Sequence, residues 1–297
     1  MGEKDIVSRT LESYNDVFAD IINVFLLGGQ EIIFPDELSD ASSVSQYKVD
    51  DKLRLQERDI LKFWKNNGIK IASVGIENQS VSDRYMSARV IGYDGAAYRS
   101  QLNENGGGLL HPVITLVMYY GKEPWTAGDS LWDCLDIREE LKPYVSNYTI
   151  NIFDINKITE EQVSSLKSDF RHIAKYMLYR NNTDEYKPDD VEVRHLREVA
   201  EFLRVFEHDD RFVEIYNDCK DREGTTMCEF IDKFEAKGRA EGEAKGRAEE
   251  RENGIRNAVL IYKKVKSSVE EAISGIIELY GLSDEAARSK VQQYWNC

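Results

Sequence analysis

The stretch from residue 69 to residue 79, Ile-Lys-Ile-Ala-Ser-Val-Gly-Ile-Glu-Asn-Gln, constrains the fold of this chain more than any other feature. It is an apolar, β-branched run that ends in a carboxylate and an amide, which predicts a buried strand with a polar end. Side chains alternate between the two faces of a strand, so Glu77 and Gln79 share one face. The small residues Ser73 and Gly75 lie on the same face and leave room for another group to approach.

A second acid, Asp59, lies upstream of this strand. Residues 48–64 are consistent with an extended segment or with a helix, and Asn-Asn-Gly at 66–68 is typical of a turn. An extended segment would form a hairpin with the following strand and bring Asp59 beside Glu77. Such a pair of carboxylates suits Mg²⁺, which prefers hard oxygen ligands. The alternative is that both acids are solvated strand ends.

The rest of the pattern alternates helices with strands. Apolar residues at helical spacing predict helices at 8–27, 83–99, 158–181 and from about 190 to 234. Apolar runs predict strands at 113–120 and 149–155 and are consistent with a short one at 31–35. This order predicts an α/β fold, with a mixed sheet flanked by helices and an all-helical C-terminal extension.

Composition narrows the class of protein. The formal net charge of −15 argues against strong nonspecific affinity for nucleic acid, because Lys and Arg supply most phosphate contacts. It leaves room for an acidic metal site and a local basic strip. There is neither an apolar run of roughly 18 residues, as a membrane span needs, nor a signal peptide. The four cysteines have no close ligand spacing. We therefore expect a cytoplasmic protein without a membrane segment.

Several segments together resemble the recombination-promoting nuclease family, whose members are also called PD-(D/E)XK nuclease-family transposases. The central match is Ile-Glu-Asn-Gln-Ser at 76–80, followed at the family's intervals by Asp83, Met86, Arg89 and Tyr93. No single one of these motifs is specific, and their combination carries the resemblance.

Other segments extend the match over residues 5–250. Arg-Asp-Ile-Leu at 58–61 stands at the position of the family's upstream Asp, and Tyr-Asn-Asp-Val-Phe at 14–18 resembles its opening helix. The strand at 113–120, Asp-Arg-Phe at 210–212 and the charged stretch near residue 240 also fit.

The resemblance implies a restriction-endonuclease-like core and Mg²⁺-dependent cleavage of DNA, with Mn²⁺ as an alternative ion. Asp59 and Glu77 would be the metal ligands, and Gln79 would stand where the wider superfamily has lysine. Asp16 would be an outer ligand or a water organiser. An amide can orient a water molecule but cannot take its proton, so another group has to act as the base.

Arg89 and Tyr93 lie four residues apart on one face of the helix predicted at 83–99. They are candidates for contacting a phosphate or for supporting the acids. An Arg that is paired with a carboxylate at the edge of the core is equally consistent with the pattern.

We divide the chain into a PD-(D/E)XK-like nuclease domain at 1–189, a helical extension at 190–235, a connector at 236–254 and a small helical tail at 255–297. The connector contains the near-repeat Ala-Lys-Gly-Arg-Ala-Glu and has no large apolar side chains, so it cannot bury a core. The tail regains helical periodicity, and Ser283 is the expected N-cap of its last helix.

The segment Arg-Glu-Gly-Thr-Thr at 222–226 precedes Met227 and can be encoded by a purine-rich sequence. We therefore hypothesise that Met227 starts a second, short product that pairs with the full chain; coincidence is the alternative.

These observations predict a Mg²⁺-dependent DNA endonuclease that hydrolyses phosphodiester bonds in recombination, mobile-element biology or defence. The alternative is a catalytically weak nuclease-fold module that acts through its helical tail on a partner or on a second copy of itself. The acid pair favours the enzyme, whereas Gln79 and the net charge favour the module.

Overall fold

The computed structural model describes residues 2–49, 52–104, 108–180 and 186–295, and it gives the backbone alone for 44–49 and 52–57. The chain divides into two compact units, Met1–Ile231 and Asp232–Cys297. No helix among the described residues is both long enough and apolar enough to cross a membrane.

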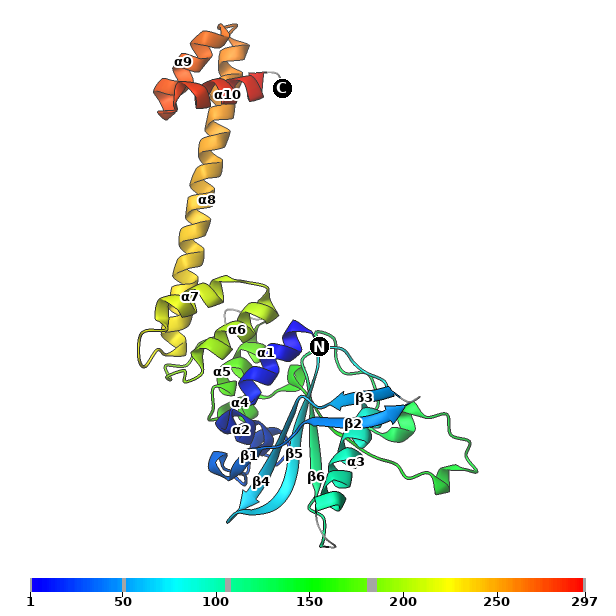
Figure 1. Cartoon of the computed structure of the whole chain (residues 1–297). Coiled ribbons are helices and arrows are strands. Elements are labelled where there is room, and N and C mark those ends of the chain that lie inside the picture. Colours follow the sequence, from blue (N-terminus) through cyan, green and yellow to red (C-terminus); the bar gives the residue numbers. More distant parts are fainter. Residues whose placement is uncertain (1, 50–51, 105–107, 181–185, 296–297) are drawn as a thin grey trace. The chain divides into compact units, whose positions relative to one another are not determined.

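A five-stranded mixed sheet forms the centre of the first unit, in the order β1-β4-β5-β6-β7 (Figure 1). Its strands are β1 (Leu38–Asp40), β4 (Ile60–Asn66), β5 (Ile69–Gln79), β6 (Val113–Tyr119) and β7 (Asn151–Asp154). Neighbours are antiparallel from β1 to β5 and parallel from β5 to β7. A separate antiparallel pair, β2 (Val44–Val49) and β3 (Lys52–Glu57), precedes β4. The structure thus confirms the mixed sheet flanked by helices.

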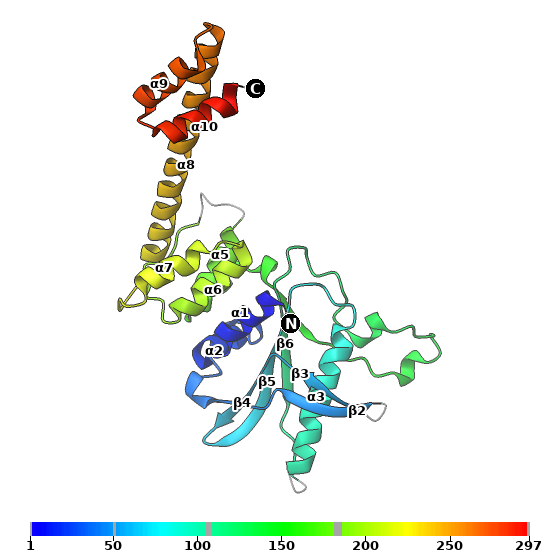
Figure 2. The same cartoon turned by 45° about the horizontal axis from the view of Figure 1, so that its top comes forward.

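Helices cover both faces of this sheet (Figures 1 and 2). Helix α3 (Met86–Glu104) packs on one face, and α1 (Glu3–Glu12) and α2 (Asn15–Phe25) lie on the other. The alternation along β5 follows this arrangement. The Glu77 side chain contacts α3, whereas the side chain of the next residue, Asn78, reaches Glu12 of α1. Both faces of β5 are therefore buried, which explains its nearly continuous apolar sequence.

The N-terminal region differs from the expected single helix at 8–27. It forms two helices, and Gly28 and Gly29 with φ of +67° and +83° follow α2. The expected strand at 31–35 is wrong. The side chain of Asn23 accepts from the backbone N–H groups of Ile32 and Ile33 and donates to the Ile33 carbonyl. These backbone groups are therefore satisfied by a side-chain amide and not by the backbone of a neighbouring strand.

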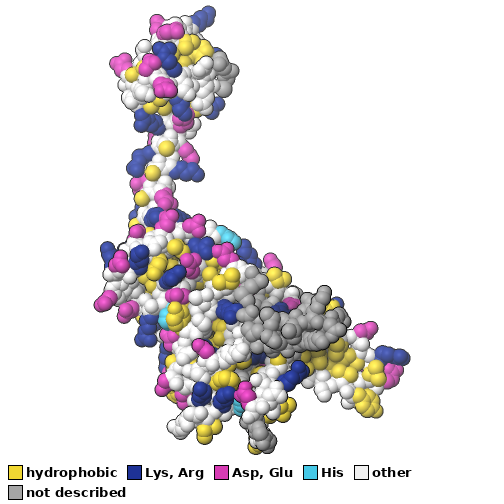
Figure 3. Space-filling model, viewed as in Figure 1, with side chains coloured by type: hydrophobic (Ala, Val, Ile, Leu, Met, Phe, Trp, Pro, Cys, Tyr) yellow, Lys and Arg dark blue, Asp and Glu magenta, His cyan; other side chains and the backbone are white. Residues whose placement is uncertain are grey.

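An extended arm, residues 131–148, projects from the sheet on the side opposite α1 (Figure 1). It contains two short 3₁₀ helices, η2 (Leu131–Cys134) and η3 (Lys142–Tyr144). The Trp132 indole donates to the Val145 carbonyl and joins the two sides of the arm. The arm exposes the apolar side chains of Leu135, Leu141 and Tyr144. Figure 3 shows hydrophobic side chains gathered on this part of the surface, at the right.

The remaining helices of the first unit follow β7. They are α4 (Glu160–Ser165), α5 (Phe170–Tyr179), α6 (Leu196–Glu207) and α7 (Arg211–Cys219). Two further 3₁₀ turns are η1 (Pro35–Glu37), which precedes β1, and η4 (Ile155–Lys157), which follows β7. The helix expected from 190 to 234 is thus divided. His208 ends α6 in the left-handed conformation, and Gly224 with φ of +73° lies between α7 and the helix that begins at Met227.

The second unit contains most of α8 (Met227–Lys264), together with α9 (Val269–Tyr280) and α10 (Asp284–Trp295). Residues 236–254, expected as a connector, lie inside the continuous helix α8. Ala, Lys, Arg and Glu are good helix formers, and ion pairs such as Glu243 with Arg247 one turn apart support the exposed stretch. The end of α8 packs on α9 and α10 around Val259 and Ile276, and Ser283 caps α10 as expected.

Candidate functional site

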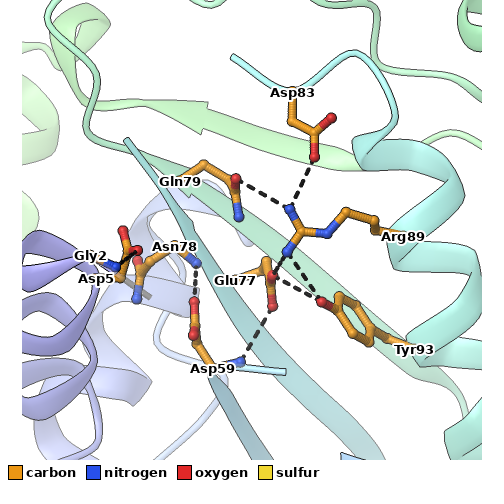
Figure 4. A network of polar contacts seen from close by, with 9 residues as sticks. All are labelled: Gly2, Asp5, Asp59, Glu77, Asn78, Gln79, Asp83, Arg89 and Tyr93. Carbon is orange, nitrogen blue, oxygen red and sulfur yellow. Dashed lines mark hydrogen bonds and ion pairs between the residues drawn. The ribbon is translucent and has the colours of Figure 1, made fainter. Parts of the chain in front are cut away.

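The β4–β5 hairpin brings the two predicted acids together. Its turn is formed by Asn67 and Gly68, which both have positive φ, and its register pairs Ile60 with Ile76. Asp59 therefore lies beside Glu77, and the Asp59 backbone N–H donates to Glu77 Oε2 at 3.3 Å (Figure 4). In return, the backbone N–H of Asn78 donates to Asp59 Oδ2 at 2.8 Å. Within the segment 48–64, the described residues 48–49, 52–57 and 60–64 lie in strands, so the extended alternative is confirmed for them.

Helix α3 adds a cation and a phenol to this pair. Arg89 Nη2 donates to Glu77 Oε1 at 2.7 Å, and the Tyr93 hydroxyl donates to the same oxygen at 3.2 Å. The other guanidinium nitrogen, Nη1, reaches Asp83 Oδ2 at 3.0 Å and Gln79 Oε1 at 3.4 Å. One Arg therefore connects three residues from the end of β5 onward (Figure 4). The alternative interpretation of Arg89 predicts such an ion pair with a carboxylate. The Arg89 side chain nevertheless remains 40% exposed.

The two acids are buried, with relative exposures of 2% for Glu77 and 8% for Asp59. Burial and then the charge of Asp59 raise the pKa of Glu77 to about 7, against the opposing effect of the Arg89 charge. Burial also raises the pKa of Asp59, although the hydrogen bond from Asn78 opposes it. Burial and mutual repulsion disfavour the ionised forms of these two carboxyl groups. A cation bound between them would therefore stabilise their ionised forms.

A third acid, Glu12, was not singled out from the sequence. It is fully buried on α1, where Asn78 Nδ2 and the Tyr120 hydroxyl each donate to it at 2.6 Å. Burial raises its pKa to about 7, and the nearby charge of Asp59 contributes to the rise. One signal in the sequence points to it: Ser8 and Glu12 lie one turn apart on the helix face that also carries Val7 and Leu11.

Two sequence expectations turn out differently in space. Asp16 lies on α2 with its carboxylate 3.2 Å from His195 Nε2, and no contact with Asp59 or Glu77 is recorded for it in the described part of the chain. The room beside Gly75 is taken by the side chain of Arg58. A Cβ atom at Gly75 would lie only 2.6 Å from Arg58 Nη1. The small residue on β5 therefore accommodates a guanidinium of this chain itself.

The carboxylate pair supplies the candidate ligands for a metal ion. The described residues contain no group of three or more His, Cys, Asp or Glu side chains arranged to hold a metal ion. Asp59 and Glu77 nevertheless fit a hard divalent cation, because their donors are carboxylate oxygens and no hydrogen bond is recorded for Asp59 Oδ1 in the part of the chain that the structure describes. A site with two protein carboxylates is consistent with Mg²⁺, which usually keeps several waters.

A family model described as "Putative transposase, YhgA-like" matches residues 33–195, which include both strands of the hairpin and all of α3. No curated protein and no solved structure matches the chain. The matched region contains Asp59, Glu77, Gln79, Arg89 and Tyr93, whereas Asp16 and Glu12 lie before it.

Proposed function

The chain belongs to the family of YhgA-like transposases, a PD-(D/E)XK-type family, because that model matches more than half of it; from this premise we propose that the protein is a metal-dependent DNA endonuclease. The expected reaction is hydrolysis of a phosphodiester bond, in recombination, mobile-element biology or defence. The observation that carries the proposal is the buried pair of carboxylates, Asp59 and Glu77, held side by side by adjacent strands.

Asp59 and Glu77 would hold Mg²⁺ or Mn²⁺. When bound, the ion would polarise the phosphodiester and lower the pKa of a bound water. The supports of the acids keep their oxygens in place. Backbone N–H groups fix one oxygen of each carboxylate, and Arg89 with Tyr93 fixes the second oxygen of Glu77. The restriction-endonuclease-like character of the sheet is part of the same proposal.

Gln79 and Arg89 are the residues that we assign to contacts with a substrate at this pair. The Gln79 amide has no proton-accepting nitrogen and no charge, so its role is to orient a water or a phosphate oxygen. Arg89 is partly exposed and presents N–H donors in a planar arrangement that suits phosphate. We propose that it contacts the DNA backbone while remaining paired with Glu77.

Nicking of supercoiled plasmid tests the proposal. Purified protein is incubated with Mg²⁺, Mn²⁺ or chelator, beside Asp59→Asn and Glu77→Gln, which keep the shape of each side chain. Asp218→Asn, an exposed acid on α7, serves as the matched control, and Asp16→Asn tests the remaining expected acid. We expect cutting that needs a divalent ion, is lost in Asp59→Asn and Glu77→Gln, and persists in the control. Folded protein that never cuts would contradict the enzyme.

One observation favours the second candidate, an interaction module. The second unit has its own apolar core around Val259 and Ile276, yet it leaves Ile261, Val265 and Leu279 more than 60% exposed. Such side chains are typical of association surfaces. A second copy of the chain is the proposed partner, and light scattering of Ile261→Glu against wild type tests it. A monomeric wild type would contradict this candidate.

The short product from Met227 is a further part of this candidate. Met227 is the first residue of α8, and Thr226 and Glu229 cap that helix reciprocally, with donor–acceptor distances of 3.3 and 3.4 Å. A product that begins at Met227 would lose the Thr226 cap but would keep the rest of the helix. Immunoblotting of the C-terminus, with wild type beside Met227→Leu, tests for it. An identical set of bands in both would contradict the internal start.

A further inference from the structure

A cavity of about 540 Å³ lies beside the candidate site, between α3 and the face of the sheet that carries Glu77. Its walls combine aromatic, small and charged side chains. They include Phe63, Ser73, Tyr93, Ala97, Arg58 and Arg99. Small-molecule and nucleotide pockets have volumes of about 300–1,000 Å³, so the cavity can hold one nucleotide.

The most informative wall residue is Arg58, which is only 2% exposed. Its Nη2 pairs with Asp94 Oδ1 at 2.5 Å, and that carboxylate also accepts from Thr115 and Tyr148. Among the residues that the structure describes, no hydrogen-bond partner is found for its Nη1, which lies against Gly75. A buried, charged donor without an acceptor is unfavourable, so an anionic ligand that reaches this nitrogen would satisfy it.

Positive charge is also in excess at this cavity. Arg99 is exposed on α3, and no ion pair is recorded for it among the described residues. Lys70 lies 3.8 Å from the centre of the Phe63 ring and 3.7 Å from the Glu104 carboxylate. Among the described residues that line the cavity, Glu104 is the single acid, against the three cations Arg58, Lys70 and Arg99.

Tyr93 belongs to both the cavity and the carboxylate site. Its hydroxyl donates to Glu77, while its ring lines the cavity and lies 5.4 Å from the Arg58 guanidinium. A ligand in the cavity would therefore lie next to whatever is held at Asp59 and Glu77. Because the two sites share Tyr93, we assign the cavity to the binding of the same substrate that is cleaved at the carboxylate pair.

We propose that this cavity binds one nucleotide of the DNA strand, adjacent to the phosphodiester at Asp59 and Glu77. The phosphate pairs with Arg58 and Arg99, and the base lies against Phe63 and Ala97. The assignment rests on the proposed function for its substrate. It adds a subsite that favours an unpaired or displaced nucleotide, because a base has to leave its duplex to enter a pocket and the cost of unpairing is lowest for a base that is already single-stranded.

Binding without cleavage tests the subsite separately from the catalytic proposal. Fluorescence anisotropy with chelator present measures the Kd of a fluorescein-labelled 12-nucleotide single strand, and of the matching duplex. The variants are Arg99→Glu, which is exposed, and Ala97→Phe, which fills the cavity. Arg197→Glu, an exposed Arg on α6, makes the same change in net charge elsewhere. Thermal melting checks that each variant is folded.

We expect the single strand to bind more tightly than the duplex, and Arg99→Glu to weaken it about tenfold with a shallower salt dependence. Ala97→Phe should weaken it similarly, and Arg197→Glu less than about twofold. Equal Kd values for wild type, Arg99→Glu and Ala97→Phe would overturn the inference, even if metal-dependent nicking is intact. Absence of single-strand binding by wild type would overturn it as well. Unlabelled dAMP that displaces the strand at its own micromolar Kd would assign the cavity to a free nucleotide and also overturn it.

Discussion

Arg89 donates to Glu77 at 2.7 Å and to Asp83 at 3.0 Å, so one side chain of α3 neutralises the buried acid and connects it to the loop after β5. The pair is asymmetric, because Glu77 is buried while Arg89 is partly exposed. The charged form of Glu77 therefore needs Arg89, because water does not reach Glu77, whereas the charge of Arg89 is also solvated by water.

The variant Arg89→Met should lose stability in a pH-dependent way. Without the cation, the pKa of Glu77 rises further above about 7, and the folded protein holds its proton to a higher pH. Stability then falls as the pH rises, since the unfolded chain releases that proton near its ordinary pKa. We expect a loss of roughly 3 kcal/mol at pH 8.5 and a smaller loss at pH 5.5. Urea unfolding measures it, with the exposed Arg84→Met as control. Equal losses at both pH values would contradict the argument.

Binding of a divalent ion should release protons near neutral pH. The ion binds the carboxylate form, and the pKa of Glu77 is about 7 in the metal-free protein. Affinity for Mn²⁺ should therefore increase from pH 6 to pH 8 and then level off. Calorimetry in two buffers of different ionisation enthalpy measures the released protons. In Glu77→Gln we expect most of the affinity for Mn²⁺ to be lost, and its pH dependence with it. If the affinity of the wild type did not change with pH, Glu77 would be ruled out as a ligand.

The variant Glu12→Gln should stabilise the protein at alkaline pH. Burial raises the pKa of Glu12 from 4.5 to about 7, so this group lowers stability as the pH rises through that window. A neutral amide removes the penalty, which corresponds to on the order of 3 kcal/mol. Urea unfolding at pH 5 and pH 8 measures the difference, with the exposed Glu3→Gln as control. A variant that follows the wild-type pH dependence would show that Glu12 is not the group responsible.

Much of the candidate site could be predicted because it is local. The turn at 66–68 fixes the register of β4 and β5, and the alternation along β5 fixes which side Glu77 faces. Arg89 and Tyr93 follow from the period of α3. Local pattern suffices for these contacts because each depends on one hairpin or on one helix.

Other features could not be predicted, because they depend on contacts far apart in the chain. Glu12 meets Asn78 on the opposite face of the sheet from Glu77, and Arg58 meets Asp94 across the gap that Gly75 leaves. Asn23 satisfies the backbone near Ile33, which no apolar pattern indicates. Tertiary packing decides all three.

The variant Asp189→Asn should destabilise the first unit at neutral pH. Burial opposes its charge, but the hydrogen bond from Lys175 and the charge of Arg171 outweigh it and hold the pKa of Asp189 below its usual range. A carboxyl group with a depressed pKa in the folded protein stabilises the fold at pH values above its ordinary pKa near 4. This stabilisation is lost as the pH falls through the pKa of the folded state. We expect a loss of about 1–3 kcal/mol at pH 7 that becomes smaller as the pH falls below the ordinary carboxyl value near 4. Thermal melting of Asp189→Asn beside the exposed Asp190→Asn measures it. A loss of the same size at pH 3 would point to shape rather than charge.

Two glycines in the helices of the second unit should respond in opposite ways to the same substitution. Around Gly246, in the middle of α8, a new Cβ meets nothing within 4 Å, so Gly246→Ala gains helix propensity of about 0.5–1 kcal/mol. On α9, a Cβ at Gly275 would clash with the hydroxyl end of the Tyr262 ring, so either this ring or the two helices have to shift. We expect Gly275→Ala to cost about 1–3 kcal/mol.

Far-ultraviolet circular dichroism during thermal melting of the full chain measures both changes. Gly246→Ala should raise the midpoint of the transition that belongs to the second unit, and Gly275→Ala should lower it. Tyr262→Phe in the Gly275→Ala background removes the clashing oxygen and should restore part of the loss. If Gly275→Ala melted like wild type, the packing of α9 against the end of α8 would be looser than these contacts indicate.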